Sequence, residues 1–177
     1  MHRRPHAAPL ARHSRCSDRV SLPTPRDLLH TFELSIVLES HAVTRAATFA
    51  ERDLCAAEAS LADFDHAMQT RRLARWAGLE IQFHRALDDQ CGNQVLAAMA
   101  ERTLREGLSA CPILSPDVLR ALQSHHLEIL RCVQNGAPET ATRHTRAHLL
   151  YLRNVLVDAL GTSTSACTPR MRSRLRT

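Results

Sequence analysis

The sequence predicts an all-α fold, an antiparallel bundle of about six helices. Ala and Leu, both strong helix formers, dominate a composition in which aromatic residues make up only 3%. Apolar residues recur at helical spacings of three and four between residues 27 and 160, and no segment has the alternating pattern of a strand. The 177 residues suffice for one domain with a substantial apolar core.

Charge divides the chain into three parts. All 23 basic residues are Arg, which is typical of coding bias in a GC-rich genome. Residues 1–26 hold six Arg, one Asp and four Pro, and residues 161–177 hold four Arg and no acid, so we predict that both are disordered, Arg-rich tails. The middle, residues 27–160, holds 13 Arg and 17 acids. The predicted domain is therefore mildly acidic and has no obvious nucleic-acid face.

The first three helices are predicted over residues 27–48, 51–68 and 71–90. Pro25 precedes the first, which carries an apolar stripe that includes Phe32, Ile36 and Val43. Gly92 follows the third and is a plausible stop signal, because glycine readily adopts the left-handed conformation that ends many helices.

The last three helices are predicted over residues 93–109, 115–134 and 138–160. Asn93 is an N-cap candidate for the fourth. Ser115 and Pro116 suit the cap and the first position of the fifth, which ends before Asn135-Gly136. The short connections imply that neighbouring helices are antiparallel.

Six Cys residues are scattered without a C-x-x-C pair, and the sequence shows neither a signal peptide nor a membrane-length apolar run. We therefore expect a reduced, cytoplasmic protein with free thiols and no membrane partner.

Four polar residues occupy positions where a helix should present an apolar side chain to the core. Glu80 and His84 lie on the stripe of the third helix, His126 on that of the fifth and His148 on that of the sixth. Burying one carboxylate and three imidazoles without partners would cost several kcal/mol. A divalent cation would satisfy them, and this donor set suits zinc, nickel or manganese.

Two other interpretations of these residues remain open. A buried His is often a hydrogen-bonded core residue rather than a ligand, and eleven His residues in the chain make a chance alignment easier. His125 and His144 lie close in sequence to the candidate ligands and are possible substitutes.

Six short motifs occur along the chain in a fixed order. They are Glu33-Leu34-x-x-x-Leu38-Glu39, Glu80-x-x-Phe83-His84-x-x-Leu87, Gly92-Asn93-x-x-Leu96, His126-x-x-Ile129-Leu130, Asn135-Gly136 and Arg146-Ala147-His148-Leu149. Over residues 27–160 the chain thereby resembles the FCD (FadR C-terminal) effector-binding domain of GntR-family transcription regulators, which carries a D-x-x-F-H-x-x-L…G-N-x-x-L signature.

This resemblance implies a bundle with a central ligand or metal cavity, in which one acid and three His hold a divalent transition metal, most often zinc. By position these are Glu80, His84, His126 and His148. It further implies that a small carboxylate or sugar acid binds at or beside the metal, that the protein is a homodimer and not an enzyme, and that effector binding alters operator affinity.

The chain departs from the family pattern at three points. Glu80 stands where the family usually has Asp, and Ser35 stands where many members have an Arg that could pair with an effector carboxylate. Arg102 and Arg105 are possible replacements, so Ser35, Arg102 and Arg105 are the candidate effector contacts. Residues 1–26 are too few to encode the winged helix-turn-helix of the family, so we expect contact with operator DNA only through a domain that this chain lacks.

Three hypotheses about function follow. The first is a metal-dependent, effector-sensing domain of a transcription regulator. The second is a metal-assisted hydrolase or isomerase on the same ligands, with Glu39 as the candidate general base. The third is a helical dimerisation module without a ligand.

Overall fold

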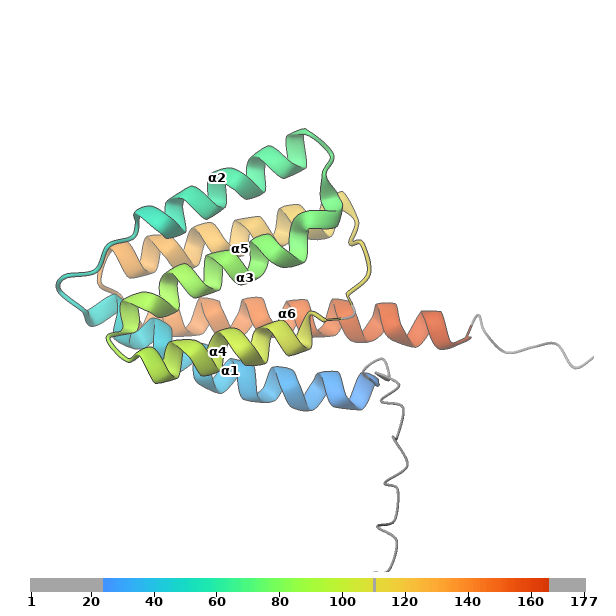
Figure 1. The fold of residues 1–177 in the computed structure, drawn as a ribbon, viewed down its shortest axis with the longest axis horizontal. Helices are drawn as coiled ribbons and strands as arrows, with labels where there is room; N and C mark the ends of the chain where they lie inside the picture. The colour runs from blue at the N-terminus through green and yellow to red at the C-terminus, as the bar shows by residue number, and fades with distance from the viewer. Residues whose placement is uncertain (1–23, 110, 166–177) are drawn as a thin grey trace, which may run out of the picture.

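The computed structural model describes residues 24–109 and 111–165, which form six α-helices and contain no strand (Figure 1). The all-α prediction is thereby confirmed, whereas most of both predicted tails, residues 1–23 and 166–177, lies outside the described residues. The helices are α1 (Pro25–Thr48), α2 (Cys55–Gln69), α3 (Trp76–Asp88), α4 (Gln94–Gly107), α5 (Pro116–Gln134) and α6 (Pro138–Ser165), and the 3-10 turns η1 (Leu73–Arg75) and η2 (Asp89–Cys91) flank α3.

Side-chain caps determine where three of the helices begin. Thr24 accepts a hydrogen bond from the backbone N–H of Asp27, whose carboxylate accepts from the N–H of Thr24 in return, which forms a capping box at α1. Asn93 caps α4 and Ser115 caps α5 in the predicted way, each accepting from the backbone N–H three residues later.

Three helix boundaries differ from the prediction by more than two residues. The second helix begins at Cys55 rather than Glu51, because the Asp53 carboxylate accepts a hydrogen bond from the Cys55 N–H and starts the helix there. The third begins at Trp76 rather than Arg71, because Arg71 lies in the left-handed region (φ 56°) and the 3-10 turn η1 follows it. Helix α6 continues past Gly161 to Ser165, since one glycine inside a helix costs only about 1 kcal/mol relative to alanine.

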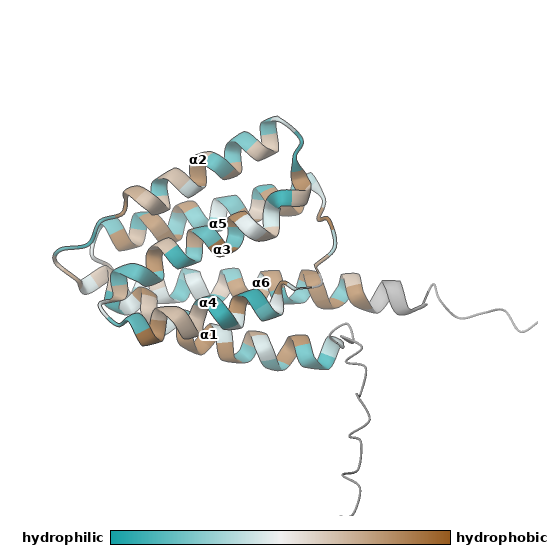
Figure 2. Ribbon diagram, in the orientation of Figure 1, coloured by the Kyte–Doolittle hydropathy of each residue, from teal (hydrophilic) through white to brown (hydrophobic). Residues whose placement is uncertain are grey.

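Successive helices run in opposite directions and form the predicted antiparallel bundle. Helix α1 packs against α6 and α4, α5 packs against α6 and α2, and α3 packs against α2 and α4 (Figure 1). Each helix interleaves hydrophobic and hydrophilic residues (Figure 2), as expected for elements that bury one face. None of the described helices is long and apolar enough to cross a membrane.

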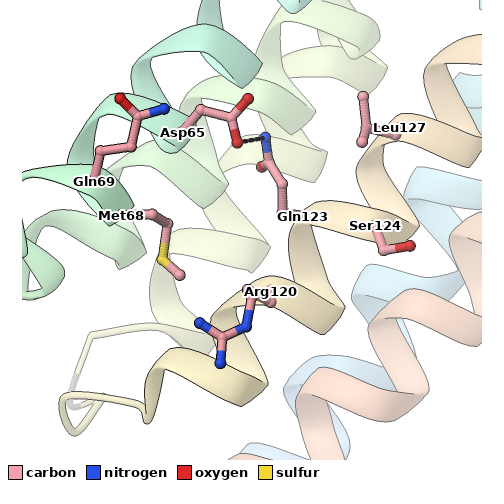
Figure 3. Close-up of a pocket in the computed structure, with 7 residues that line it drawn as sticks. All are labelled: Asp65, Met68, Gln69, Arg120, Gln123, Ser124 and Leu127. Atoms are coloured by element: carbon pink, nitrogen blue, oxygen red, sulfur yellow. Dashed lines mark hydrogen bonds between the residues drawn. The ribbon is translucent and has the colours of Figure 1, made fainter.

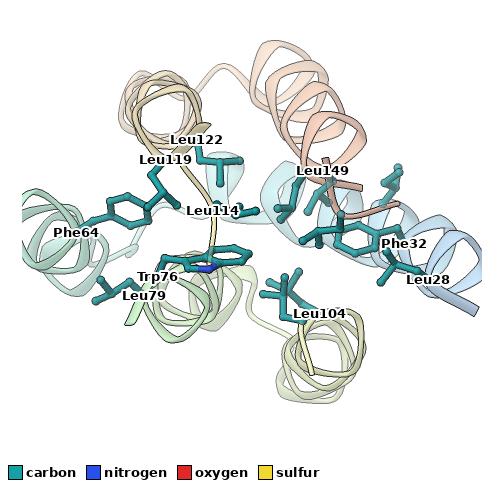
Figure 4. Packing of buried hydrophobic residues seen from close by; sticks show 14 of the residues in the cluster. Leu28, Phe32, Phe64, Trp76, Leu79, Leu104, Leu114, Leu119, Leu122 and Leu149 are labelled. Atoms are coloured by element: carbon teal, nitrogen blue, oxygen red, sulfur yellow. The ribbon is translucent and has the colours of Figure 1, made fainter. Parts of the chain in front are cut away.

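Two apolar clusters fill the interior. The first surrounds Trp76 and includes Leu119, Leu122 and Leu149 (Figure 4). The second surrounds Phe83, stacked against the ring of His126, with Ile129 and Val133 close by. The sequence order of these residues shows what separates the clusters. On α5, for example, His126 lies between Leu122 of the first cluster and Ile129 of the second.

The same interruption occurs on three other helices. Glu80 and His84 follow Leu79 of the first cluster and precede Leu87 of the second on α3. On α1, Glu39 lies between Ile36 of the first cluster and Val43 of the second. On α6, His148 lies between Ala141 of the second cluster and Leu149 of the first. A polar layer contributed by four helices therefore crosses the middle of an otherwise apolar core.

Candidate metal centre

The polar layer brings together the four residues that the helical stripes predicted. Glu80 and His84 come from α3, His126 from α5 and His148 from α6, and no side chain among them is more than 2% exposed. One donor atom from each lies within 4.8 Å of the other three. Three helices that are distant in sequence thus direct one carboxylate and three imidazoles at a common point.

The separations of the donor atoms in this group lie on both sides of the separation of ligands around a small cation, from 2.6 Å to at most 4.8 Å. The Nε2 atom of His148 lies 2.6 Å from Oε1 of Glu80 and 3.1 Å from Nε2 of His84, and Nε2 of His126 lies 3.2 Å from Oε2 of Glu80. A zinc ion with ligands at about 2.1 Å separates those ligands by about 3.4 Å in a tetrahedron. The closest pair, His148 and Glu80, would have to move apart to hold such an ion, whereas the other two distances are already close to this value.

Several of these atoms have no hydrogen-bond partner among the described residues. Oε2 of Glu80 and Nε2 of His126 face each other, yet neither makes a hydrogen bond of acceptable geometry. Orphaned polar atoms in a dry core are costly. A cation between the carboxylate and the imidazole would satisfy both, so the residues present fit a metal.

The pKa shifts of Glu80, His126 and His148 favour the protonation states that bind a metal. Burial lowers the pKa of His126 and lowers that of His148 to about 4, so both imidazoles are neutral at neutral pH. Burial alone would raise the pKa of Glu80, but the imidazoles of His126 and His148 outweigh it and hold that pKa well below the usual range. Neutral imidazole and ionised carboxylate are the forms that bind metals.

His84 differs from the other two histidines because it faces a second carboxylate. Its Nδ1 atom lies 2.9 Å from Oε2 of Glu39, and both side chains are 2% exposed. Burial would lower the pKa of His84, but the carboxylates of Glu39 and Glu80 raise it well above the usual value. Glu39 therefore contacts the far side of the imidazole, away from the shared centre.

A comparison with known families agrees with the motif order. A family model described as the FCD domain matches residues 30–151. The chain belongs to the FCD family. A search of curated proteins found no match. The resemblance inferred from the motifs is confirmed, and an FCD domain is the effector-binding domain of a GntR-family regulator.

The candidate effector contacts of this FCD domain lie in different places. Ser35 is buried in α1 and its hydroxyl has no hydrogen-bond partner among the described residues. Arg102 and Arg105 instead lie on the outer face of α4, 71% and 60% exposed, where they pair with Glu106 and Glu101. The structure therefore does not bring either arginine to the metal centre.

The two neighbouring histidines also lie outside the group of four. His125 is partly buried and its ring lies against the rings of His148 and Tyr151. His144 lies one turn before His148 on α6 and is partly exposed. Among the described residues the only cluster with metal-binding geometry consists of the four predicted ligands.

Two grooves of the FCD domain lie between α2 and α5. One of about 470 Å³ is lined by residues that include Met68 and Leu127, and at its base Gln123 donates a hydrogen bond to Asp65 (3.1 Å; Figure 3). The other, of about 530 Å³, continues past Leu127 towards Gln134. Neither includes any of the four predicted ligands.

Cys111 is a residue near the centre that the sequence did not single out. Burial and the negative charge of Glu80 raise the pKa of its thiol to about 12. At pH 8 we therefore expect iodoacetamide to alkylate Cys111 far more slowly than the exposed Cys55, as followed by peptide mass spectrometry. Equal labelling rates in the native protein would contradict this; urea-unfolded protein, in which both thiols react, is the control.

Proposed function

We propose that this FCD domain binds one divalent transition metal through Glu80, His84, His126 and His148. Zinc is the first choice, with nickel and manganese as alternatives. The observation that supports this most strongly is the convergence of one carboxylate and three imidazoles within 4.8 Å in a fully buried layer. Nitrogen and carboxylate oxygen ligands are the usual set for these metals.

The proposed effector is a small carboxylate or sugar acid that binds at or beside the metal. A cation held there would supply the positive charge that attracts the carboxylate. Three buried hydroxyls, those of Ser35 and Ser40 on α1 and Thr145 on α6, have no hydrogen-bond partner among the described residues. Thr145 lies one turn before His148 on the same face of α6, so its hydroxyl is suited to bind an effector beside the centre.

Such an effector would act by changing helix packing. Helices α1 and α6 pack closely against each other and carry these three hydroxyls, so a ligand between them would favour one of two packings. In this proposal the protein is a cytoplasmic homodimer. The effector-dependent change in helix packing would alter the affinity for operator DNA through a DNA-binding domain outside residues 27–160.

The position of Glu39 favours a sensor over an enzyme. A general base for metal-assisted hydrolysis must reach the substrate or a water molecule on the metal. Glu39 instead accepts a hydrogen bond from Nδ1 of His84, the nitrogen on the far side of the ring from the shared centre. A sensor requires no base, and the domain type is regulatory.

The test uses tag-free protein loaded with zinc and a panel of hydroxy acids, dicarboxylates and sugar acids. We expect about one metal ion per chain, and stabilisation of about 2.7 kcal/mol by an effector at 100 times its Kd. Thr145→Val should keep the metal but lose the effector shift, whereas Thr103→Val, a buried threonine on α4, should keep both. Absence of metal, or turnover of a panel compound, would overturn the sensor proposal.

A further inference from the structure

Two further buried acids lie behind the candidate metal centre. Glu39 on α1 is 2% exposed and Asp88 in the last turn of α3 is 1% exposed. Neither is among the four predicted metal ligands. Two carboxyls in an apolar core are costly unless each has a defined partner, so their position calls for a reason.

Glu39 has such a partner in His84. Its Oε2 atom accepts a hydrogen bond from Nδ1 of His84 at 2.9 Å. On the other side of the ring, Nε2 of His84 lies 3.1 Å from Nε2 of His148 and 3.4 Å from Oε1 of Glu80. The hydrogen bond that one ring nitrogen makes decides which nitrogen is offered to a metal. Because Nδ1 is hydrogen-bonded to Glu39, Nε2 is the nitrogen of His84 that can bind a metal.

The side chain of Asp88 interacts with that of Glu39. Asp88 follows His84 by four residues, one turn later on α3, so both residues face α1. One oxygen of each acid, Oε1 of Glu39 and Oδ2 of Asp88, has no partner unless a proton lies between the carboxyls. Burial first, and then the neighbouring Glu39, raise the pKa of Asp88 well above its usual value, which agrees with Asp88 carrying that proton.

We propose that Asp88, Glu39 and His84 form a positioning chain behind the metal centre. The Asp88 carboxyl donates a hydrogen bond to Glu39, Glu39 accepts a second from Nδ1–H of His84, and His84 thereby presents Nε2 to the cation. Glu39 and Asp88 do not touch the metal. This inference depends on the proposed metal binding, and it assigns a role to two acids outside the four ligands.

The test measures zinc affinity by competition with a chromogenic chelator. Glu39→Ala should weaken binding by roughly 10- to 100-fold, the usual effect of losing such a partner. Glu39→Gln keeps an oxygen acceptor for Nδ1–H and should fall between Glu39→Ala and the wild type. Asp88→Asn keeps a donor to Glu39 and should bind zinc nearly as the wild type does, whereas Asp88→Ala should bind more weakly.

A spectroscopic readout separates positioning from a general loss of stability. In the zinc form, Nδ1–H of His84 should give a slowly exchanging, far-downfield proton resonance in the wild type and in Glu39→Gln, but not in Glu39→Ala. Val133→Ala, which truncates a fully buried residue of α5, is the control for destabilisation and should leave both zinc affinity and this resonance unchanged.

The outcomes are distinct. If the wild type binds no zinc, the proposed function fails and the positioning chain with it. If the wild type binds zinc and Glu39→Ala binds it equally well, the positioning role of Glu39 alone is wrong. If Asp88→Asn weakens binding as much as Asp88→Ala, the hydrogen bond from Asp88 to Glu39 is wrong. Should Glu39→Ala not fold, Glu39→Gln decides the same question: zinc affinity below that of the wild type, with the downfield resonance kept, supports the positioning role, whereas unchanged zinc affinity overturns it.

Discussion

Replacing His126 with Ala is expected to abolish metal binding and the stabilisation that the metal provides. His126 is fully buried and contributes one of three imidazoles, on a helix that supplies no other ligand. A metal present at 1,000 times its Kd stabilises the folded state by about 4.1 kcal/mol. For a domain of this size that corresponds to roughly 8–16 °C in Tm. The wild type should show this shift on adding zinc, and His126→Ala should show almost none.

The decisive quantity is the difference between melts with and without zinc. His126→Ala also leaves a space against Phe83, whose ring stacks on the imidazole at 4.2 Å, so its metal-free Tm should fall as well. His66→Ala, an exposed histidine on α2, is the matched control and should keep both the metal and the shift. Elemental analysis that still finds one metal per chain in His126→Ala would show that the ligand set is wrong.

The helices and the burial of the four predicted ligands could be anticipated because both depend on local periodicity. Once a helix is assumed, residues three and four apart share a face, so Leu122, His126 and Ile129 must point the same way. The caps Asn93 and Ser115 act through neighbours three residues away and are visible in sequence for the same reason.

What the sequence did not reveal depends on contacts between helices or on weak local signals. Asp88 has no periodic signature as a functional residue, and only the packing of α3 on α1 places it against Glu39. Cys111 lies outside any helix, so its closeness to Glu80 could not be read from a stripe. The start of α2 was misplaced because Asp53, not Glu51, provides the first hydrogen bond.

For Glu39, the burial could be predicted from the sequence but the role could not. Its place on the inward stripe of α1 was visible, and it suggested a catalytic base. Its role depends on which atom of His84 it contacts, and that is set by the packing of α3 on α1. Periodicity indicates which residues are buried, but the partner of a buried polar group is a property of the tertiary structure.

Substitutions at Glu80 should separate metal binding from the stability of the core. Glu80 is the only carboxylate among the four predicted ligands, and its oxygens lie 2.6 Å from His148 and 3.2 Å from His126. Glu80→Gln has nearly the same shape and keeps an oxygen that accepts from His148. Its metal-free Tm should therefore stay close to that of the wild type, while the Tm shift on adding zinc should disappear because an amide is a poor ligand for the cation.

Glu80→Asp addresses the departure of this chain from the family pattern. Aspartate keeps the negative charge but withdraws it by one methylene, about 1.5 Å, from imidazoles whose positions are fixed by α5 and α6. We expect zinc affinity, measured by chelator competition, to fall in the order wild type, Glu80→Asp, Glu80→Gln. If Glu80→Asp binds more tightly than the wild type, the family residue is the better ligand and glutamate here weakens the site. A metal ligand and a structural hydrogen-bond acceptor respond to the amide in opposite ways. If Glu80→Gln lowers the metal-free Tm and keeps the Tm shift on adding zinc, Glu80 is a hydrogen-bonded core residue rather than a metal ligand.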